Sequence, residues 1–167
     1  MKLAMSQCLI LACGNTLRGD DGVGPWLAEW AAERFGADPG VRSLARQQWT
    51  PDLAEEVAQA ASVIFVDCAA NSAPGQIQLE PVKPSAELPR LLTHQLSAAD
   101  LMRLCRSYYD SFPQNAFLLT VGGDALDLHE GFSNSVQAAL PDAKGVLEGT
   151  VLRLLAVTAV SAAVQLA

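Results

Sequence analysis

Two adjacent carboxylates, Asp20 and Asp21, lie in a glycine-rich segment between an apolar strand-like run and a helix-like run. The segment, residues 14–24, reads GNTLRGDDGVG. A strand–loop–helix arrangement normally indicates phosphate binding, because the helix N-terminus offers free N–H groups and a positive dipole end. Two carboxylates would repel a phosphate and attract a cation. The spacing also fails the G-x-G-x-x-G template, and no lysine follows the glycines as a P-loop requires. The segment therefore predicts a cation site or an acid–base site.

Two further residues could join this site. Asp67 ends the β-branched, apolar run 62–67, and His94 lies in the segment LTHQL that precedes a helix-like run. Together with Asp21 they would offer two carboxylates and an imidazole, a ligand set that suits zinc or nickel and can polarise a water for hydrolysis. Spacing alone leaves plainer alternatives open. An aspartate at a strand end can form a turn, and His94 can hydrogen-bond within its own loop.

Other reactive side chains have structural interpretations that are simpler. Cys68 could act as a nucleophile beside Asp67, but there is no G-x-S-x-G elbow, and a core thiol is the better hypothesis. His129 is expected in a solvated loop. Trp49, beside two glutamines, could line a groove. For Asp20 we expect a helix cap, and the alternative is a residue that orients Asp21.

Composition indicates a compact globular protein. The chain has 167 residues, of which 50% are hydrophobic and 17% are charged, so one domain with a large core is expected. A formal net charge of −7 argues against nucleic acid and anionic membranes as partners. Four cysteines without C-x-x-C spacing suggest buried free thiols in a reducing compartment, and hence the cytoplasm. We expect no signal peptide, and a helix rather than a membrane span over 146–167.

The pattern of apolar runs alternates between strand and helix. Strands are predicted over 8–13, 41–44, 62–67, 76–81 and 116–121, and helices from Pro25 to Phe35, over 52–58, over 97–109 and from Ser133 onward. Thr50 and Ser97 are the expected N-caps, and Asp100 at the third helical position makes a variant of the capping box with Ser97. Pro141 with Gly145 predicts a break or kink in the last helix. This order predicts a single three-layer α/β domain, with a mostly parallel twisted sheet of about five strands and helices on both faces. Ligands in such sheets gather at the carboxyl ends of the strands, where Asp21 and Asp67 would meet.

Four blocks of this chain resemble the hydrogenase maturation endopeptidases, which trim the large subunit of nickel–iron hydrogenases. Residues 14–24 match the family's G-N-x-L-x-x-D-[DE]-G-x-G throughout. Residues 63–69, VIFVDCA, resemble the strand that ends on the family's second acid, and 94–101, HQLSAADL, resemble its histidine loop. Residues 120–133 resemble the late strand and the loop into the last helix. The resemblance covers about residues 8–145 in the right order, and residues 150–167 of the single domain 1–167 lie outside it.

The resemblance implies an activity and a site. The family's metal-binding trio corresponds to Asp21, Asp67 and His94, which would recognise nickel already inserted into the immature large subunit. The metal would therefore arrive with the protein substrate, and the enzyme would remove a short C-terminal extension from the hydrogenase large-subunit precursor. Whether hydrolysis uses a metal-bound water or a carboxylate as general base stays open.

The sequence departs from the family after the second strand. Many members have Asp-Gly-Gly there, whereas this chain has ARQQWTP at 45–51, so the path of the bound peptide is expected to differ. Three hypotheses follow: a processing endopeptidase, a non-catalytic nickel-binding chaperone of the large subunit, and an unrelated small-molecule hydrolase on the same frame.

Overall fold

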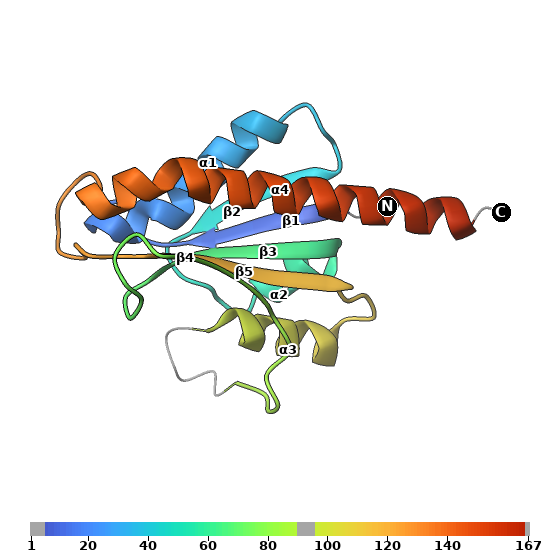
Figure 1. Cartoon of the computed structure of the whole chain (residues 1–167). Coiled ribbons are helices and arrows are strands. Elements are labelled where there is room, and N and C mark those ends of the chain that lie inside the picture. Colours follow the sequence, from blue (N-terminus) through green and yellow to red (C-terminus); the bar gives the residue numbers. More distant parts are fainter. Residues whose placement is uncertain (1–5, 90–95, 166–167) are drawn as a thin grey trace.

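The fold is a three-layer α/β sandwich, seen in a computed structural model that describes residues 6–89 and 96–165 (Figure 1). The sheet has the order β2-β1-β3-β5-β4, in which β1, β2, β3 and β5 run parallel and β4 is antiparallel to β5. The predicted fold class is confirmed. The strands are β1 (Ser6–Cys13), β2 (Val41–Arg46), β3 (Ala60–Ala69), β4 (Ile77–Pro81) and β5 (Asn115–Gly122). The helices are the short 3-10 turn η1 (Gly19–Gly22), α1 (Val23–Phe35), α2 (Leu53–Ala58), α3 (Ala98–Tyr108) and α4 (Asn134–Gln165).

Two apolar cores lie on opposite faces of the sheet. Because side chains alternate along a strand, Ile10 and Ala12 face α1 and α4, whereas Leu9 and Leu11 face α2 and α3. The central strands are therefore buried on both faces, which explains their continuous apolar sequences. Figure 1 shows the same two helix layers above and below the sheet.

Helix α3 begins at a capping box that the sequence predicts. The Ser97 hydroxyl accepts a hydrogen bond from the Asp100 N–H at 3.1 Å, and the Asp100 carboxylate accepts one from the Ser97 N–H at 3.0 Å. This reciprocal pair satisfies two N–H groups that have no partner within the helix.

Three predicted helix boundaries need correction. Helix α1 starts two residues before Pro25, because η1 leads directly into it. Helix α2 has Asp52 and not Thr50 at its N-cap, and no side chain caps it. The break expected in α4 is wrong: the helix continues through Pro141 and Gly145. Pro141 is exposed, so water can reach the Gln137 carbonyl that it leaves without an N–H partner.

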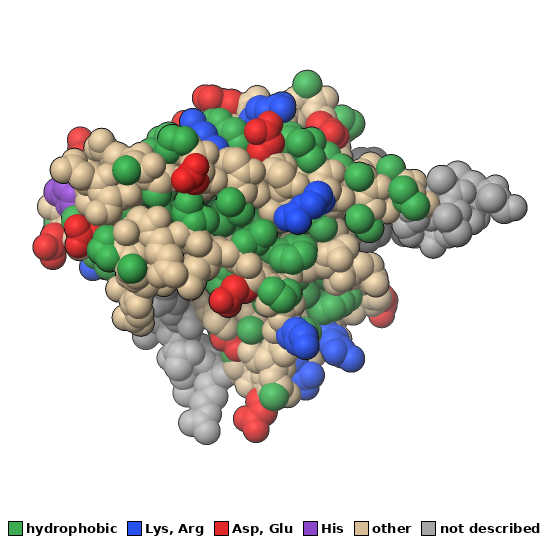
Figure 2. Space-filling view, viewed as in Figure 1, with side chains coloured by type: hydrophobic (Ala, Val, Ile, Leu, Met, Phe, Trp, Pro, Cys, Tyr) green, Lys and Arg blue, Asp and Glu red, His purple; other side chains and the backbone are tan. Residues whose placement is uncertain are grey.

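Helix α4 continues past the edge of the sheet (Figure 1), and its distal part carries the exposed apolar side chains Leu152, Val157 and Val160. Figure 2 shows such hydrophobic side chains among scattered charges on this face. No helix in the described ranges is both long and apolar enough to cross a membrane. The four cysteines are free thiols, as predicted.

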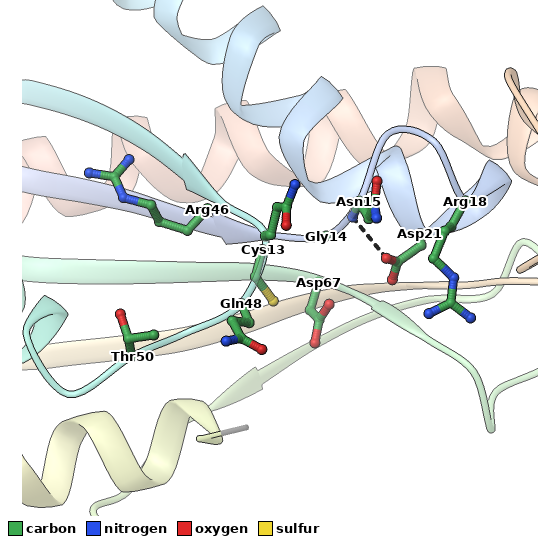
Figure 3. A pocket seen from close by; sticks show the side chains of 10 residues that line it. Cys13, Gly14, Asn15, Arg18, Asp21, Arg46, Gln48, Thr50 and Asp67 are labelled. Atoms are coloured by element: carbon green, nitrogen blue, oxygen red, sulfur yellow. Dashed lines mark hydrogen bonds between the residues drawn. The ribbon is translucent and has the colours of Figure 1, made fainter. Parts of the chain in front are cut away.

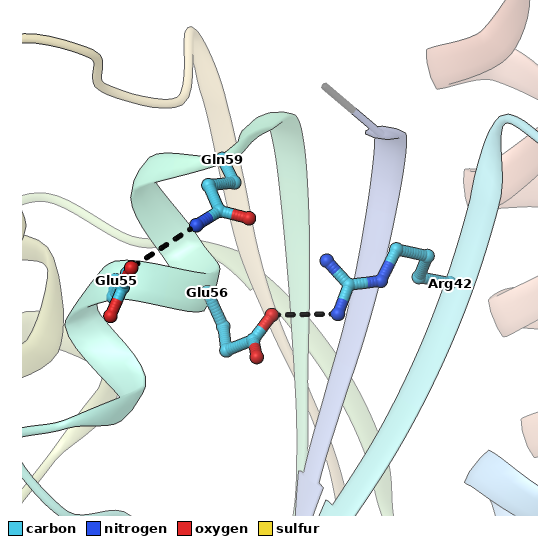
Figure 4. A network of polar contacts seen from close by, with 4 residues as sticks. All are labelled: Arg42, Glu55, Glu56 and Gln59. Carbon is cyan, nitrogen blue, oxygen red and sulfur yellow. Dashed lines mark hydrogen bonds and ion pairs between the residues drawn. The ribbon is translucent and has the colours of Figure 1, made fainter. Parts of the chain in front are cut away.

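A polar contact joins β2 to α2 (Figure 4). The Arg42 Nη2 and Glu56 Oε2 atoms lie 2.7 Å apart, and Gln59 donates a longer hydrogen bond of 3.5 Å to Glu55. Both partners of the ion pair are partly exposed, so its expected contribution to stability is at most about 1 kcal/mol. The fold therefore depends on its two cores.

Candidate functional site

The loop that follows β1 folds back so that Asp21 lies over the end of that strand. Gly14 has a φ of +144°, and a Cβ atom there would lie 1.9 Å from the Asp21 carbonyl oxygen. Only glycine permits this close return. The Asp21 carboxylate then accepts a hydrogen bond of 2.8 Å from the Asn15 N–H. The glycine and asparagine of the segment GN thus fix the position of Asp21.

Asp67 lies near the carboxyl end of β3, the parallel neighbour of β1. Its Oδ1 accepts a hydrogen bond of 2.8 Å from the Cys68 N–H, and the Cys13 thiol also hydrogen-bonds to its carboxylate. Asp21 and Asp67 face one cavity of about 530 Å³ (Figure 3). The cavity is lined by Cys13, Gly14, Asn15, Arg18, Asp21, Arg46, Gln47, Gln48, Thr50 and Asp67.

The charge of Asp21 acts on the carboxylate of Asp67. Burial raises the pKa of Asp67 to about 6, the hydrogen bonds from Cys13 and Cys68 oppose that rise, and the charge of Asp21 adds to it. A raised pKa next to a second carboxylate indicates a site at which a cation would be favourable. The predicted meeting of Asp21 and Asp67 at one edge of the sheet is therefore observed.

The third member of the predicted trio, His94, lies outside the described residues. Within residues 6–89 and 96–165, no three histidine, cysteine or acidic side chains are grouped closely enough to hold a metal ion. Asp21 and Asp67 provide two carboxylates, so a ligand from elsewhere is required for a three-ligand site. The assignment of His94 remains a prediction.

Asp20 has a different role from its neighbour. It is fully buried, and its carboxylate accepts hydrogen bonds from the N–H groups of Asp124 (2.8 Å), Ala125 (2.9 Å) and Ser133 (2.7 Å). Burial alone would raise its pKa, but these bonds lower the pKa below the usual value. The expected helix cap is wrong, since Gly22 precedes α1. Asp20 instead joins the first loop to the loop between β5 and α4.

The structure also decides between the interpretations of the remaining reactive residues. Burial, followed by the charges of Asp21 and Asp67, raises the pKa of the Cys68 thiol to about 12, so Cys68 is no nucleophile at neutral pH. His129 lies in an exposed loop, as expected.

Trp49 does not line a groove. Only 4% of its surface is exposed, and it packs edge-on against Phe65 with ring centroids 5.4 Å apart.

Four polar side chains that line the cavity were not named as site residues from the sequence: Arg18, and Arg46, Gln47 and Gln48 of the segment 45–51 that was expected to alter the path of the bound peptide. Arg18 could have been found from its position between Gly14 and Asp21. For the three residues at the end of β2, the available signal was that β2 and β1 are parallel neighbours, which brings the ends of both strands to the same edge.

The protein thus has a mostly parallel α/β sheet on which Asp21, in the turn η1 after β1, and Asp67, in β3, bring two carboxylates to the edge where such sheets bind their ligands. No protein-family model and no curated protein matches the chain. Solved structures do. The hydrogenase maturating endopeptidase HybD from E. coli is 22% identical, with a TM-score of 0.68, over 87% of this chain and 92% of its own.

Two archaeal proteins show the same likeness. The [NiFe] hydrogenase maturation protease HycI from Thermococcus kodakarensis is 22% identical, with a TM-score of 0.65, over 89% of this chain and 91% of its own. The hydrogenase 2 maturation peptidase from a Thaumarchaeota archaeon is 20% identical, with a TM-score of 0.62, over 86% and 97%. The chain therefore has the fold of the hydrogenase maturation endopeptidases, in agreement with the resemblance of its motifs.

Proposed function

We propose that this protein is an endopeptidase that removes the C-terminal extension of a nickel–iron hydrogenase large-subunit precursor after nickel insertion. The observation that carries the proposal is the convergence of Asp21 and Asp67 on one open cavity, in a fold shared with hydrogenase maturation proteases. The four sequence blocks that resemble this family add independent support.

In this proposal Asp21, Asp67 and His94 recognise nickel that the substrate carries. A small number of oxygen and nitrogen ligands suits a metal that is bound and released with its protein better than a metal held permanently. The requirement for nickel ensures that the extension is cut only after the large subunit has received its metal.

Hydrolysis consumes one water. The water oxygen adds to the carbonyl carbon of the peptide bond, a carboxylate in the cavity accepts the water's proton, and the C–N bond breaks as the leaving nitrogen takes up that proton. Asp67 is placed for this exchange, since its carboxylate faces the cavity that also contains Asp21.

The test uses purified protein with nickel-loaded and nickel-free precursor, and the mass of the large subunit is measured. Trimming of the loaded form alone is the expected result. Binding of the loaded precursor without a change in mass would contradict the endopeptidase proposal and support a non-catalytic nickel-binding chaperone. Absence of both binding and trimming would exclude the two hydrogenase-related functions.

A further inference from the structure

Arg18 is held in place at the mouth of the carboxylate cavity. Its N–H donates to the Asn15 carbonyl oxygen at 3.0 Å, and its backbone pairs with that of His129. The next residue, Gly19, donates to the His129 carbonyl oxygen at 2.9 Å, so the loop is fixed on both sides of Arg18. The Arg18 Nε donates to the Leu126 carbonyl oxygen at 3.3 Å. This last bond directs the exposed guanidinium toward the loop between β5 and α4 and leaves its two Nη groups free of the Leu126 carbonyl.

The conformation of this loop requires a glycine at position 19. Gly19 has a φ of +52°, and a Cβ atom there would lie 2.2 Å from the His129 ring and 2.5 Å from the Ala125 carbonyl oxygen. Asp20 follows, with its carboxylate bonded to three N–H groups of the β5–α4 loop. Arg18 therefore sits on a rigid support, as a preorganised site requires.

The Arg18 guanidinium lies beside Asp21 without being neutralised by it. Figure 3 shows the Arg18 and Asp21 side chains next to each other at one end of the cavity, whereas the Arg46 guanidinium points away from the carboxylates. The ion pairs in the described part of the chain are Arg34–Glu148 and Arg42–Glu56. Neither involves Arg18, so its terminal Nη groups remain available to a ligand in the cavity.

Peptide hydrolysis needs a group that stabilises a negatively charged oxygen. When water adds to the carbonyl carbon, the electron pair of the C=O bond moves to oxygen, and it returns when the C–N bond breaks. Asp21 and Asp67 cannot stabilise that negative oxygen, because both carry acceptor atoms only when ionised. The Arg18 guanidinium can, since it always carries a positive charge and presents several donors in one plane.

We propose that Arg18 binds the carbonyl oxygen of the peptide bond that is cut and stabilises its negative charge in the transition state. This inference rests on the endopeptidase activity proposed above. Arg18 is then a catalytic residue whose role differs from that of the carboxylates in the same cavity. The carboxylates bind the cation and accept the proton, and the guanidinium stabilises the oxyanion.

The experiment measures kcat and KM for the trimming of nickel-loaded precursor by four variants. Arg18→Gln is expected to lower kcat by about 10²–10³-fold with little change in KM, as removal of one oxyanion donor does elsewhere. Arg18→Lys keeps the charge without the planar fork, and should restore part of the lost kcat. Arg46→Gln tests the other guanidinium of the cavity and should cost less. Arg106→Gln, an exposed arginine on α3, is the charge-matched control and should leave kcat unchanged.

Several results would overturn the assignment. A kcat of Arg18→Gln within about threefold of wild type would do so, as would a rise in KM alone, which indicates ground-state binding. Equal losses for Arg18→Gln and Arg46→Gln would show an effect of overall charge. Thermal unfolding of each variant controls for folding. Failure of the wild-type protein to trim loaded precursor would instead refute the proposed function itself. Trimming by the wild-type protein is therefore measured before any variant is tested.

Discussion

Asp20 and Asp21 are neighbours in sequence and differ in function because their surroundings differ. Asp20 is enclosed and accepts three backbone hydrogen bonds, which stabilise its ionised form. Asp21 accepts one bond from Asn15 and faces the cavity. The same residue type thus supplies a structural link at one position and a candidate cation ligand at the next.

Removal of the Asp20 carboxylate should destabilise the protein strongly. Asp20→Ala leaves three N–H groups without an acceptor, and we expect a loss of about 3 kcal/mol or more in the free energy of unfolding. Asp20 has a lowered pKa, so its stabilising effect is present above its unfolded-state value and is lost as pH falls through the folded-state value. Chemical denaturation at neutral pH measures the loss. Asp124→Ala, which removes an exposed carboxylate from the adjoining loop, is the control, and an equal loss there would contradict the explanation.

Asp67 should show the opposite relation between charge and stability. Its pKa is raised to about 6, so the folded protein holds this proton more tightly than the unfolded chain. Its contribution to stability therefore falls as pH rises between the unfolded-state value near 4 and the folded-state value near 6.

Asp67→Asn removes the charge and keeps an oxygen that can accept the Cys68 N–H. We expect the variant to exceed wild type in unfolding free energy by on the order of 2 kcal/mol at pH 8, and by less at about pH 5. Urea denaturation at the two pH values tests this, with Asp52→Asn as an exposed control. A variant less stable than wild type at pH 8 would show that burial of the ionised Asp67 carboxylate does not destabilise the folded protein.

At the scale of elements, local signals predicted most of the secondary structure. The β-branched run 62–67 and the Ser97–Asp100 capping box carry their signals within a few residues, and both appear as expected. The continuity of α4 and the burial of Trp49 could not be predicted, because both depend on packing against distant elements. Val136 and Leu147 of α4 pack on the sheet on either side of Pro141, and this contact maintains the helix direction.

Helix α4 should gain stability when Pro141 is replaced. Pro141→Ala restores an N–H that can donate to the Gln137 carbonyl oxygen, and removes the ring from the helix interior. We expect a gain of about 1–3 kcal/mol in unfolding free energy, with helix content by circular dichroism nearly unchanged. Asp142→Ala, at the neighbouring exposed position, controls for helix propensity alone. No gain over this control would indicate that the helix is interrupted at Pro141.

At the scale of the whole molecule, the site depends on topology. Parallel β1 and β3 lie side by side, so residues 21 and 67 meet although 46 positions separate them. This meeting was predictable from the sequence, because Asp21 lies in the loop that follows one apolar strand and Asp67 ends another. The orientations of Arg18 and Arg46 were not predictable, because they depend on contacts with the β5–α4 loop and on the local path of β2.

The chain offers its own matched pair for testing the third ligand, since its two histidines are His94 and His129. His94→Ala should abolish trimming of nickel-loaded precursor, because a site with two carboxylates alone lacks the nitrogen ligand that nickel favours. His129→Ala should trim at the wild-type rate, since that side chain lies in an exposed loop, its ring nitrogen hydrogen-bonds to the nearby Asp127 carbonyl oxygen, and the backbone contacts of residue 129 with Arg18 and Gly19 are kept. Both variants are expected to unfold at wild-type temperatures, because neither substitution removes a hydrophobic side chain. Mass spectrometry of the large subunit and thermal unfolding check these outcomes. Normal trimming by His94→Ala would remove His94 from the site and leave Asp21 and Asp67 to act with a ligand supplied by the substrate.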